Sequence, residues 1–231
     1  NKGNIVGIIL PDITNEFFAE IALKIQLYLL KQNYLAIICN TNESEDIEKA
    51  YLLMLNARLV AGLIYITHDS TELNFSPTTP TIYIDRKPFQ KDLHKHYIFI
   101  ESENLQGGYL ATNHLIERNC KKIAIISLGG NRSSHMNRYY GYKKAVIEAG
   151  FPEDENLVTF VDAANYEEGY RATHSIVENN PNLDAIFYTT DILALGALRS
   201  LQEKGLRVPE DIKVVGFDDI HACSYSVPPL T

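Results

Sequence analysis

Two adjacent aspartates, Asp218 and Asp219, directly follow the apolar run 212–217. The run is bounded by polar residues and has the length of a strand that is buried on both faces. In an open α/β sheet, ligands bind at the carboxyl ends of parallel strands. Carboxylates at such a position could accept hydrogen bonds from the hydroxyl groups of a ligand. The alternative is that they cap the next turn.

A second group of candidate residues follows the first predicted strand. Asp12 and Asn15 lie between that strand and its helix, where their side chains could exchange hydrogen bonds with hydroxyl groups. Asn15 equally suits the N-cap of the helix. Phe17 and Phe18 are adjacent in the helix and therefore point in directions about 100° apart. We expect one of the two rings to lie in the core.

Two further charged residues are candidates, one at the end of a strand and one in a helix. Asp85 ends a predicted strand and precedes Arg86. Its side chain could take part in a local salt bridge or turn, or its carboxylate could bind a ligand. Arg138 lies early in a predicted helix, where most arginines are solvated. Its guanidinium presents a rigid fork of donors that matches vicinal hydroxyls or carboxylates. We expect an exposed Arg138 side chain whose removal leaves the fold intact.

Alternating strand and helix patterns position these residues. Strands separated by helical stretches predict parallel sheets with right-handed crossovers. Two such series predict an α/β protein of two doubly wound subdomains, 1–101 and 102–231, with a hinge near 101–103. Strands are predicted at 5–10, 34–39, 61–66, 81–85, 97–101, 122–127, 157–161, 185–188 and 212–217, and helices at 16–31, 45–56, 105–118, 134–149, 166–179 and 192–204.

Composition narrows the class of protein. The chain has 231 residues, 45% of them hydrophobic, and a formal net charge of -8, which disfavours direct binding of nucleic acid by this part of the chain. No apolar run approaches the ~20 residues of a membrane span. Cys39, Cys120 and Cys223 have no metal-ligand spacing, so we expect buried, reduced thiols in a cytoplasmic protein.

Several short motifs follow one another along the chain, each occurring once. They are VGIILPDITNEFFAE at 6–20, IYIDR at 82–86, ENLQGG at 103–108, RYYG at 138–141, DILALGA at 191–197, RVPED at 207–211, VGFDD at 215–219 and PPLT at 228–231. Each motif is weak alone, but the ordered set resembles the effector-binding core of LacI/GalR-type transcriptional regulators over essentially the whole chain. This resemblance implies a type I periplasmic-binding-protein-like fold, with two subdomains joined by three crossovers and a small effector in the cleft.

The resemblance also implies partners and further segments. A helix-turn-helix head of about 60 residues would precede the chain, and a stretch after Thr231 would complete both subdomains. Effector binding would rotate two subunits that carry these heads on operator DNA. Operators are usually two half-sites related by two-fold symmetry, so a homodimer is expected. The expected protein is a cytoplasmic regulator, and a repressor in particular.

The resemblance assigns roles within the site. It makes Asp85 a cleft carboxylate, Arg138 the group that grips the effector, and one of the two phenyl rings an apolar wall. Thr190 stands where many family members carry an asparagine, which removes a bidentate amide. The predicted ligand-binding set is Asp12, Asn15, Phe17, Phe18, Asp85, Arg138, Thr190 and Asp218.

Polar groups flanked by phenyl rings favour a hydroxyl-rich ligand, either a mono- or disaccharide or a nucleoside. Arg132 and Arg138, beside a Gly-Gly loop and a helix N-terminus, could also hold a phosphate, so a phosphosugar is a further option. No cofactor is expected.

Two other function classes fit the sequence less well. The first is an extracytoplasmic sugar-binding receptor of an ABC transporter, but the motifs at 207–211 and 228–231 resemble the regulators instead. The second is an enzyme, which the absence of GxSxG, P-loop, HExxH and strand-linked GxGxxG motifs disfavours. His94 and His96 are expected on the surface. Asp218, Asp219 and His221 have turn spacing only, which is weak support for a metal site.

Overall fold

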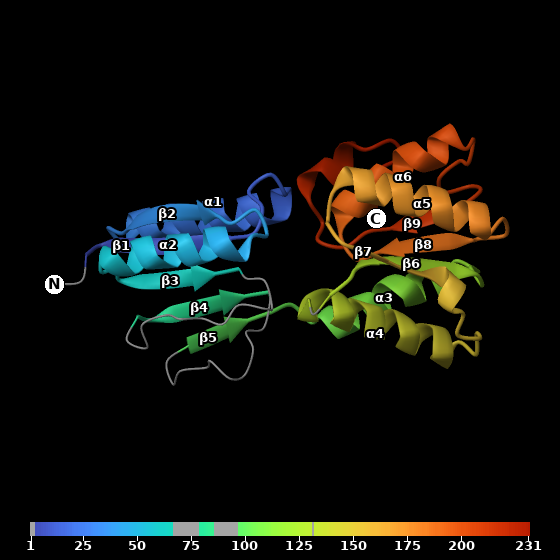
Figure 1. Ribbon diagram of the computed structural model, residues 1–231. Coiled ribbons are helices and arrows are strands. Elements are labelled where there is room, and N and C mark those ends of the chain that lie inside the picture. Colours follow the sequence, from blue (N-terminus) through green and yellow to red (C-terminus); the bar gives the residue numbers. More distant parts are fainter. Residues whose placement is uncertain (1–2, 67–78, 86–96, 131) are drawn as a thin grey trace. The chain divides into compact units, whose positions relative to one another are not determined.

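The computed structural model describes residues 3–66, 79–85, 97–130 and 132–231. The chain divides into two compact units, Asn1–Ser102 (unit 1) and Glu103–Thr231 (unit 2). Both units are α/β, with parallel sheets, so the predicted fold class is confirmed (Figure 1). The predicted surface histidines His94 and His96, and Arg86 beside Asp85, lie outside the described residues.

Unit 1 is built on a five-stranded sheet of order β2-β1-β3-β4-β5, in which every neighbouring pair is parallel. Its elements are β1 (Ile5–Leu10), α1 (Glu16–Lys31), β2 (Leu35–Asn40), α2 (Glu45–Ala57), β3 (Gly62–Tyr65), β4 (Thr81–Ile84) and β5 (Tyr97–Ile100).

The two helices of unit 1 cover opposite faces of its sheet, because successive strand side chains alternate between faces. Ile8 lies in an apolar cluster with Phe18 of α1. Its neighbour Ile9 lies in a separate cluster with Leu52 of α2. The long strand β1 is thus buried on both faces, as its continuous apolar sequence predicts.

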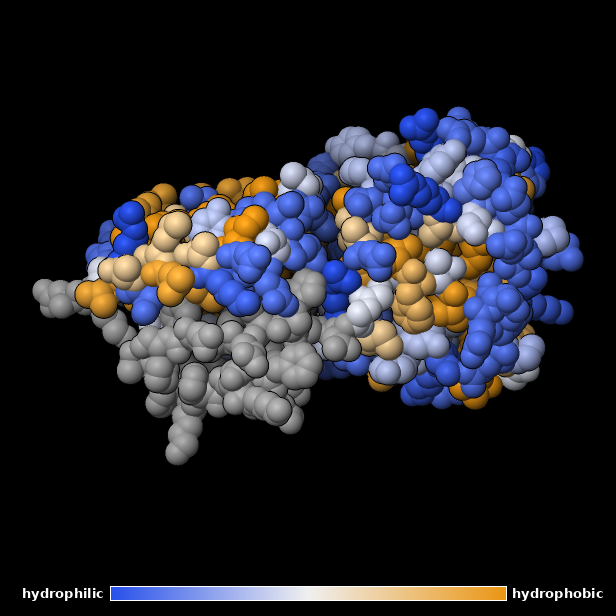
Figure 2. Space-filling view, in the orientation of Figure 1, coloured by the Kyte–Doolittle hydropathy of each residue, from blue (hydrophilic) through white to orange (hydrophobic). Residues whose placement is uncertain are grey.

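Apolar side chains also reach the surface of unit 1. Figure 2 shows them gathered over the region of α1 and α2. On α1, Leu23, Leu27 and Leu30 are 53%, 51% and 66% exposed. Their spacing of four and three residues places them on one side of the helix.

Unit 2 is built on a four-stranded parallel sheet of order β7-β6-β8-β9. The core clusters place α3 and α4 on one face and α5 and α6 on the other. Its elements are α3 (Asn104–Glu117), β6 (Ile123–Leu128), α4 (Ser133–Glu148), η2 (Glu155–Leu157), β7 (Val158–Val161), α5 (Tyr166–Asn179), β8 (Ala185–Tyr188), α6 (Asp191–Glu203), β9 (Lys213–Val215) and η3 (His221–Tyr225).

Close contact between α3 and α4 depends on two glycines. A Cβ added to Gly108 of α3 would lie 2.1 Å from the carbonyl oxygen of Arg138, and one added to Gly141 of α4 would lie 2.1 Å from that of Leu105. Only glycine permits such an approach of two backbones. The pair of glycines therefore seats the Arg138 segment of α4 directly on α3.

In both units the strand order reverses next to the first strand. In unit 1 the chain passes from β1 outward to β2 and then back to β3 on the other side of β1; β6, β7 and β8 repeat this pattern in unit 2. Such switch points, at the carboxyl ends of the strands, are where ligands bind in open α/β sheets. Residues that follow β1, β6 and β8 are therefore the candidates for ligand binding.

The predicted strands and helices are all present, most of them within one or two residues of the expected bounds. The main difference is β9, which ends at Val215 instead of Phe217; the N–H of the next residue, Gly216, donates to the carbonyl oxygen of Thr231 at 2.8 Å. The three cysteines are free and buried, as expected. Among the described residues, no helix is long and apolar enough to cross a membrane.

Candidate functional site

Arg138 is the centre of a polar cluster in unit 2. Its Nε donates to Asn104 Oδ1 at 2.9 Å, and its Nη1 donates to the carbonyl oxygen of Thr189 at 2.6 Å and to Asp218 Oδ1 at 3.2 Å. The guanidinium also lies 3.7 Å from the centre of the Phe217 ring. Residues from α3, α4 and the ends of β8 and β9 thus meet around one cation.

Asp218 is held from a second direction by Thr190. The Thr190 hydroxyl donates to Asp218 Oδ2 at 2.6 Å, so each carboxylate oxygen has a protein donor. Thr190 is the N-cap residue of α6, but its side chain makes no capping hydrogen bond. The three residues predicted for unit 2, Arg138, Thr190 and Asp218, are therefore brought together at the carboxyl ends of two neighbouring strands.

The expectation of an exposed Arg138 is wrong. Its side chain is 3% exposed, and that of its ion-pair partner Asp218 is 5% exposed. A carbonyl, an amide, a carboxylate and an aromatic ring replace the water that would otherwise solvate the charge. Removal of one member of the pair would therefore leave a buried charge without this compensation.

Sequence reasoning missed several members of this region. Asn104 is 34 residues from Arg138 in the chain and begins α3. Behind Arg138, the His135 ring and the Ser127 hydroxyl both contact Thr189 Oγ1, at 3.0 and 3.3 Å. These contacts join segments that are far apart in sequence, and no local pattern reveals them.

Ser134, at the start of α4, is a further residue that the sequence analysis did not identify. It is fully buried, and its Oγ has no hydrogen-bond partner within the described part of the chain. It precedes Arg138 by four residues and so shares its side of the helix. Buried polar atoms without partners are rare and call for an explanation. The spacing to Arg138 was the signal that could have identified it.

In unit 1, Asp12 and Asn15 organise the turn between β1 and α1. Asp12 Oδ1 accepts hydrogen bonds from the backbone and hydroxyl of Thr14, at 2.8 and 2.7 Å. Asn40, at the end of β2, accepts from the backbone N–H of Ile13 at 2.8 Å. Asn15 is the N-cap of α1, and its side chain accepts from the backbone N–H of Phe17. The capping alternative for Asn15 is confirmed.

The two adjacent phenylalanines point in different directions, as predicted. Phe18 is 7% exposed and belongs to the apolar cluster under α1. Phe17 is half-buried at the edge of that cluster, with its ring centre 5.3 Å from that of Phe18. Phe18 is therefore the core residue of the pair.

Asp85 directly follows β4 and is buried, with 5% of its surface exposed. Its backbone N–H donates to the carbonyl oxygen of Ile100 at 2.9 Å, and its φ of +69° lies in the left-handed region. Because β3 separates β1 from β4, Asp85 lies about 10 Å from the end of β1 along the sheet edge. Asp12 and Asp85 occupy the same edge of the sheet at separate places.

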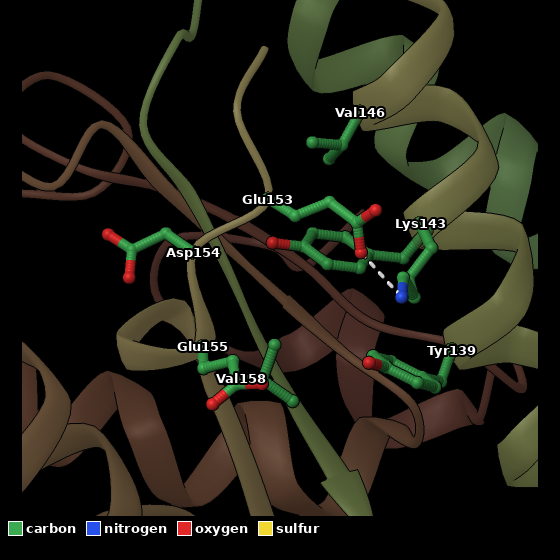
Figure 3. Close-up of a pocket in the computed structure, with 8 residues that line it drawn as sticks. Tyr139, Lys143, Val146, Glu153, Asp154, Glu155 and Val158 are labelled. Atoms are coloured by element: carbon green, nitrogen blue, oxygen red, sulfur yellow. Dashed lines mark ion pairs between the residues drawn. The ribbon is translucent and has the colours of Figure 1, made fainter.

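A hollow of roughly 340 Å³ lies elsewhere in unit 2, between α4 and the segment before β7 (Figure 3). The Tyr139 and Tyr142 rings line it, and Lys143 and Glu153 form an ion pair of 2.5 Å at its side. Its acidic residues precede Val158, the first residue of β7, so the hollow belongs to the amino ends of the strands. The strand-end rule therefore does not favour it as the effector site.

Comparisons with known proteins agree with the fold described above. The sequence model of the periplasmic binding protein-like domain family matches residues 112–231. The chain is 35% identical to the HTH-type transcriptional repressor PurR of Vibrio atlanticus, over all of this chain and 69% of that protein. It is 32% identical to the ribose operon repressor of Halalkalibacterium halodurans, over 98% of this chain and 66% of that protein.

A solved structure of a regulator has a similar fold. It is a periplasmic binding protein/LacI transcriptional regulator of Alkaliphilus metalliredigens in complex with D-xylulofuranose, with a TM-score of 0.83 and 26% identity. The alignment covers 99% of this chain and 83% of that one. These relatives are regulators, which favours a regulator over a transport receptor. The chain belongs to the LacI family of transcriptional regulators, in which it forms the ligand-binding core.

Proposed function

We propose that the polar cluster of Asn104, Arg138, Thr190 and Asp218 binds the effector of this regulator. The observation that carries the proposal is the buried Arg138–Asp218 pair at the carboxyl ends of β8 and β9, stacked on Phe217. An ion pair so placed contributes both donors and acceptors at the edge where ligands of open α/β sheets bind. Ser134 adds a buried hydroxyl that a ligand atom would satisfy.

A neutral, hydroxyl-rich ligand fits this chemistry best. Each hydroxyl both donates and accepts, and a carboxylate has about four acceptor sites, so Asp218 can bind protein donors and ligand hydroxyls together. The charge of Arg138 is already matched by Asp218. A mono- or disaccharide or a nucleoside is therefore favoured over a phosphosugar. The sugar named with the Alkaliphilus structure and the ribose operon of the Halalkalibacterium repressor support a sugar-like ligand.

Unit 1 carries candidate ligand-binding residues of its own in this proposal. Asp12, Asn15 and Asp85 lie at the carboxyl ends of β1 and β4, where the strand-end rule places ligand groups. Phe17, the half-buried ring beside the core residue Phe18, is the member of the pair that supplies an apolar wall for the ring of the ligand. The two units would act as the two effector-binding subdomains.

In the full-length protein, effector binding would alter the affinity of a helix-turn-helix segment for operator DNA. A coupling of about 1–3 kcal/mol changes that affinity by roughly 5–150-fold. A cytoplasmic homodimer matches the symmetry of operators. The exposed apolar face formed by Leu23, Leu27 and Leu30 of α1 supplies a surface suited to a partner subunit. Such a protein regulates transcription and catalyses no reaction.

Thermal-shift screening tests the proposed ligand. The chain would be heated with pentoses, hexoses, disaccharides, phosphosugars and nucleosides, and a bound ligand at 100 times its Kd would stabilise it by about 2.7 kcal/mol. We expect Asp218→Asn to lose most of the shift. The control is Tyr142→Phe, which removes a buried hydrogen bond to the Ile123 carbonyl, away from the cluster, and should keep the full shift. A ligand that stabilises Asp218→Asn as much as the wild type would contradict the proposal.

A further inference from the structure

Asp191, the first residue of α6, reaches across to the segment that carries Asp218. Its Oδ2 accepts a hydrogen bond from the backbone N–H of Ile220 at 2.9 Å. Its own N–H donates to the carbonyl oxygen of Phe217 at 2.8 Å, and the Cys223 thiol also hydrogen-bonds to its carboxyl group. One buried side chain and its backbone thus hold both ends of the turn around Asp218.

This turn needs such support because its backbone is unusual. Asp218 has a φ of +107° and Asp219 a φ of +55°, values that residues other than glycine rarely adopt. Backbone of this kind persists only where the surrounding structure imposes it. At Gly216 an added Cβ would lie 2.0 Å from Asp191 Oδ1, so the carboxylate occupies the space that a side chain would take.

The contacts of Asp191 lead directly to the geometry of the ligand cluster. Thr190, its neighbour in the chain, binds Asp218 Oδ2, while Arg138 binds Oδ1. If the turn from Gly216 to Ile220 relaxed, the Asp218 carboxylate would leave both donors. Arg138 would then lose its ion pair with Asp218.

We propose that Asp191 is a positioning residue, which fixes Asp218 against Arg138 without itself contacting the effector. Its effect on effector affinity rests on the proposed function of the cluster, whereas its effect on the Arg138–Asp218 pair does not. Burial raises the pKa of Asp191, and the hydrogen bonds from Ile220, Cys223 and Phe217 oppose that rise. The hydrogen bonds from Ile220 and Cys223 are among the contacts that hold the turn.

Nitrogen-15 NMR of the arginine side chains tests the positioning role in the absence of any ligand. The Arg138 Nε–H is buried and hydrogen-bonded to Asn104, so its signal reports the packing of the guanidinium. We expect Asp191→Ala to shift this signal and to speed its exchange with solvent at least about tenfold, as expected when protected groups become open to water. Asp191→Asn, which keeps an oxygen acceptor for Ile220, should restore most of the wild-type signal.

Gly216→Ala perturbs the same contact from the opposite side and should give the same change as Asp191→Ala. It also provides the readout if Asp191→Ala does not fold. Asp184 is the matched control, because its carboxylate accepts from the backbone N–H groups of Lys121 and Lys122 at 2.7 and 2.8 Å, before β6 and β8. Asp184→Ala should lower the melting temperature but leave the Arg138 signal in place.

Two results would overturn the proposal. One is an unchanged Arg138 signal in a folded Asp191→Ala or Gly216→Ala variant. The other is an equal change in Asp184→Ala, which would show that any loss of stability disturbs the cluster. Because no ligand is present, a failure of the proposed effector site would be recognised separately, by a ligand that binds Asp218→Asn as tightly as wild type.

Discussion

Replacement of Arg138 by alanine should strongly destabilise unit 2. The change removes the hydrogen bonds to Asn104, Thr189 and Asp218 and the stack on Phe217, and it takes the Arg138 cation away from the Asp218 carboxylate, which is 5% exposed. Breaking a buried ion pair by removing one partner costs about 3–5 kcal/mol. The acceptors left on Asn104 and Thr189 are part of the same loss. Since whole domains are stable by about 5–15 kcal/mol, this is a large fraction.

Urea denaturation of the Arg138→Ala variant measures this loss in the transition of unit 2. Arg199→Ala is the matched control, because Arg199 also lies on a helix of unit 2 but is 78% exposed and pairs with Glu203 in the i,i+4 arrangement. Exposed helical pairs of this kind contribute about 0.3–0.5 kcal/mol. A double-mutant cycle with Asp218→Ala should give a coupling energy of about 0.5–3 kcal/mol, since the double variant removes both charges of the pair.

A stability within about 0.5 kcal/mol of the wild type, as for ordinary surface substitutions, would refute this reasoning. It would mean that water solvates Arg138 and that the expectation from sequence was right after all. A coupling energy near zero would show that the Arg138–Asp218 contact of 3.2 Å contributes nothing to stability.

Three further predictions concern single side chains. Asp218→Asn should weaken effector binding by about 1–3 kcal/mol in calorimetry, and unchanged affinity would leave Asp218 with a role in the turn alone. Burial raises the pKa of Asp191 above its unfolded value of about 3.9, so the folded chain binds this proton more tightly. The contribution of this group to the free energy of unfolding therefore falls as pH rises from about 4 through the raised pKa, and Asp191→Asn should remove that slope in urea titrations; an unchanged slope would show that Asp191 does not cause it. Tyr142→Phe should cost about 1 kcal/mol in the same assay, because its hydroxyl donates to the buried carbonyl of Ile123 at 2.8 Å; no loss would contradict that contact.

Most of the fold could be predicted from sequence because the apolar runs have unambiguous periods. All six residues of β6 are buried, as expected for a strand covered on both faces. The early end of β9 could not be predicted, since the segment that follows it is bonded to Asp191, which lies in another element. Local propensity carries no information about such tertiary support.

Part of the candidate site in unit 2 could also be predicted from the sequence. The strand-end rule selected Asp218 and the family resemblance selected Thr190, and the structure joins the two through a hydrogen bond. The burial of Arg138 could not be predicted, because its partners Asn104 and Thr189 are 34 and 51 residues away in the chain. The sequence of a single helix reveals that a residue is a charged arginine, but it does not reveal which groups from other elements surround the side chain.

The most direct test of the effector site is the NMR signal of Arg138 Nε during titration with a ligand that raises the melting temperature of the wild-type chain. Binding at the cluster should move this signal in proportion to occupancy, while the signal of the exposed Arg199 stays in place. A ligand that stabilises the chain and saturates it without moving the Arg138 signal would place the effector site elsewhere in the protein.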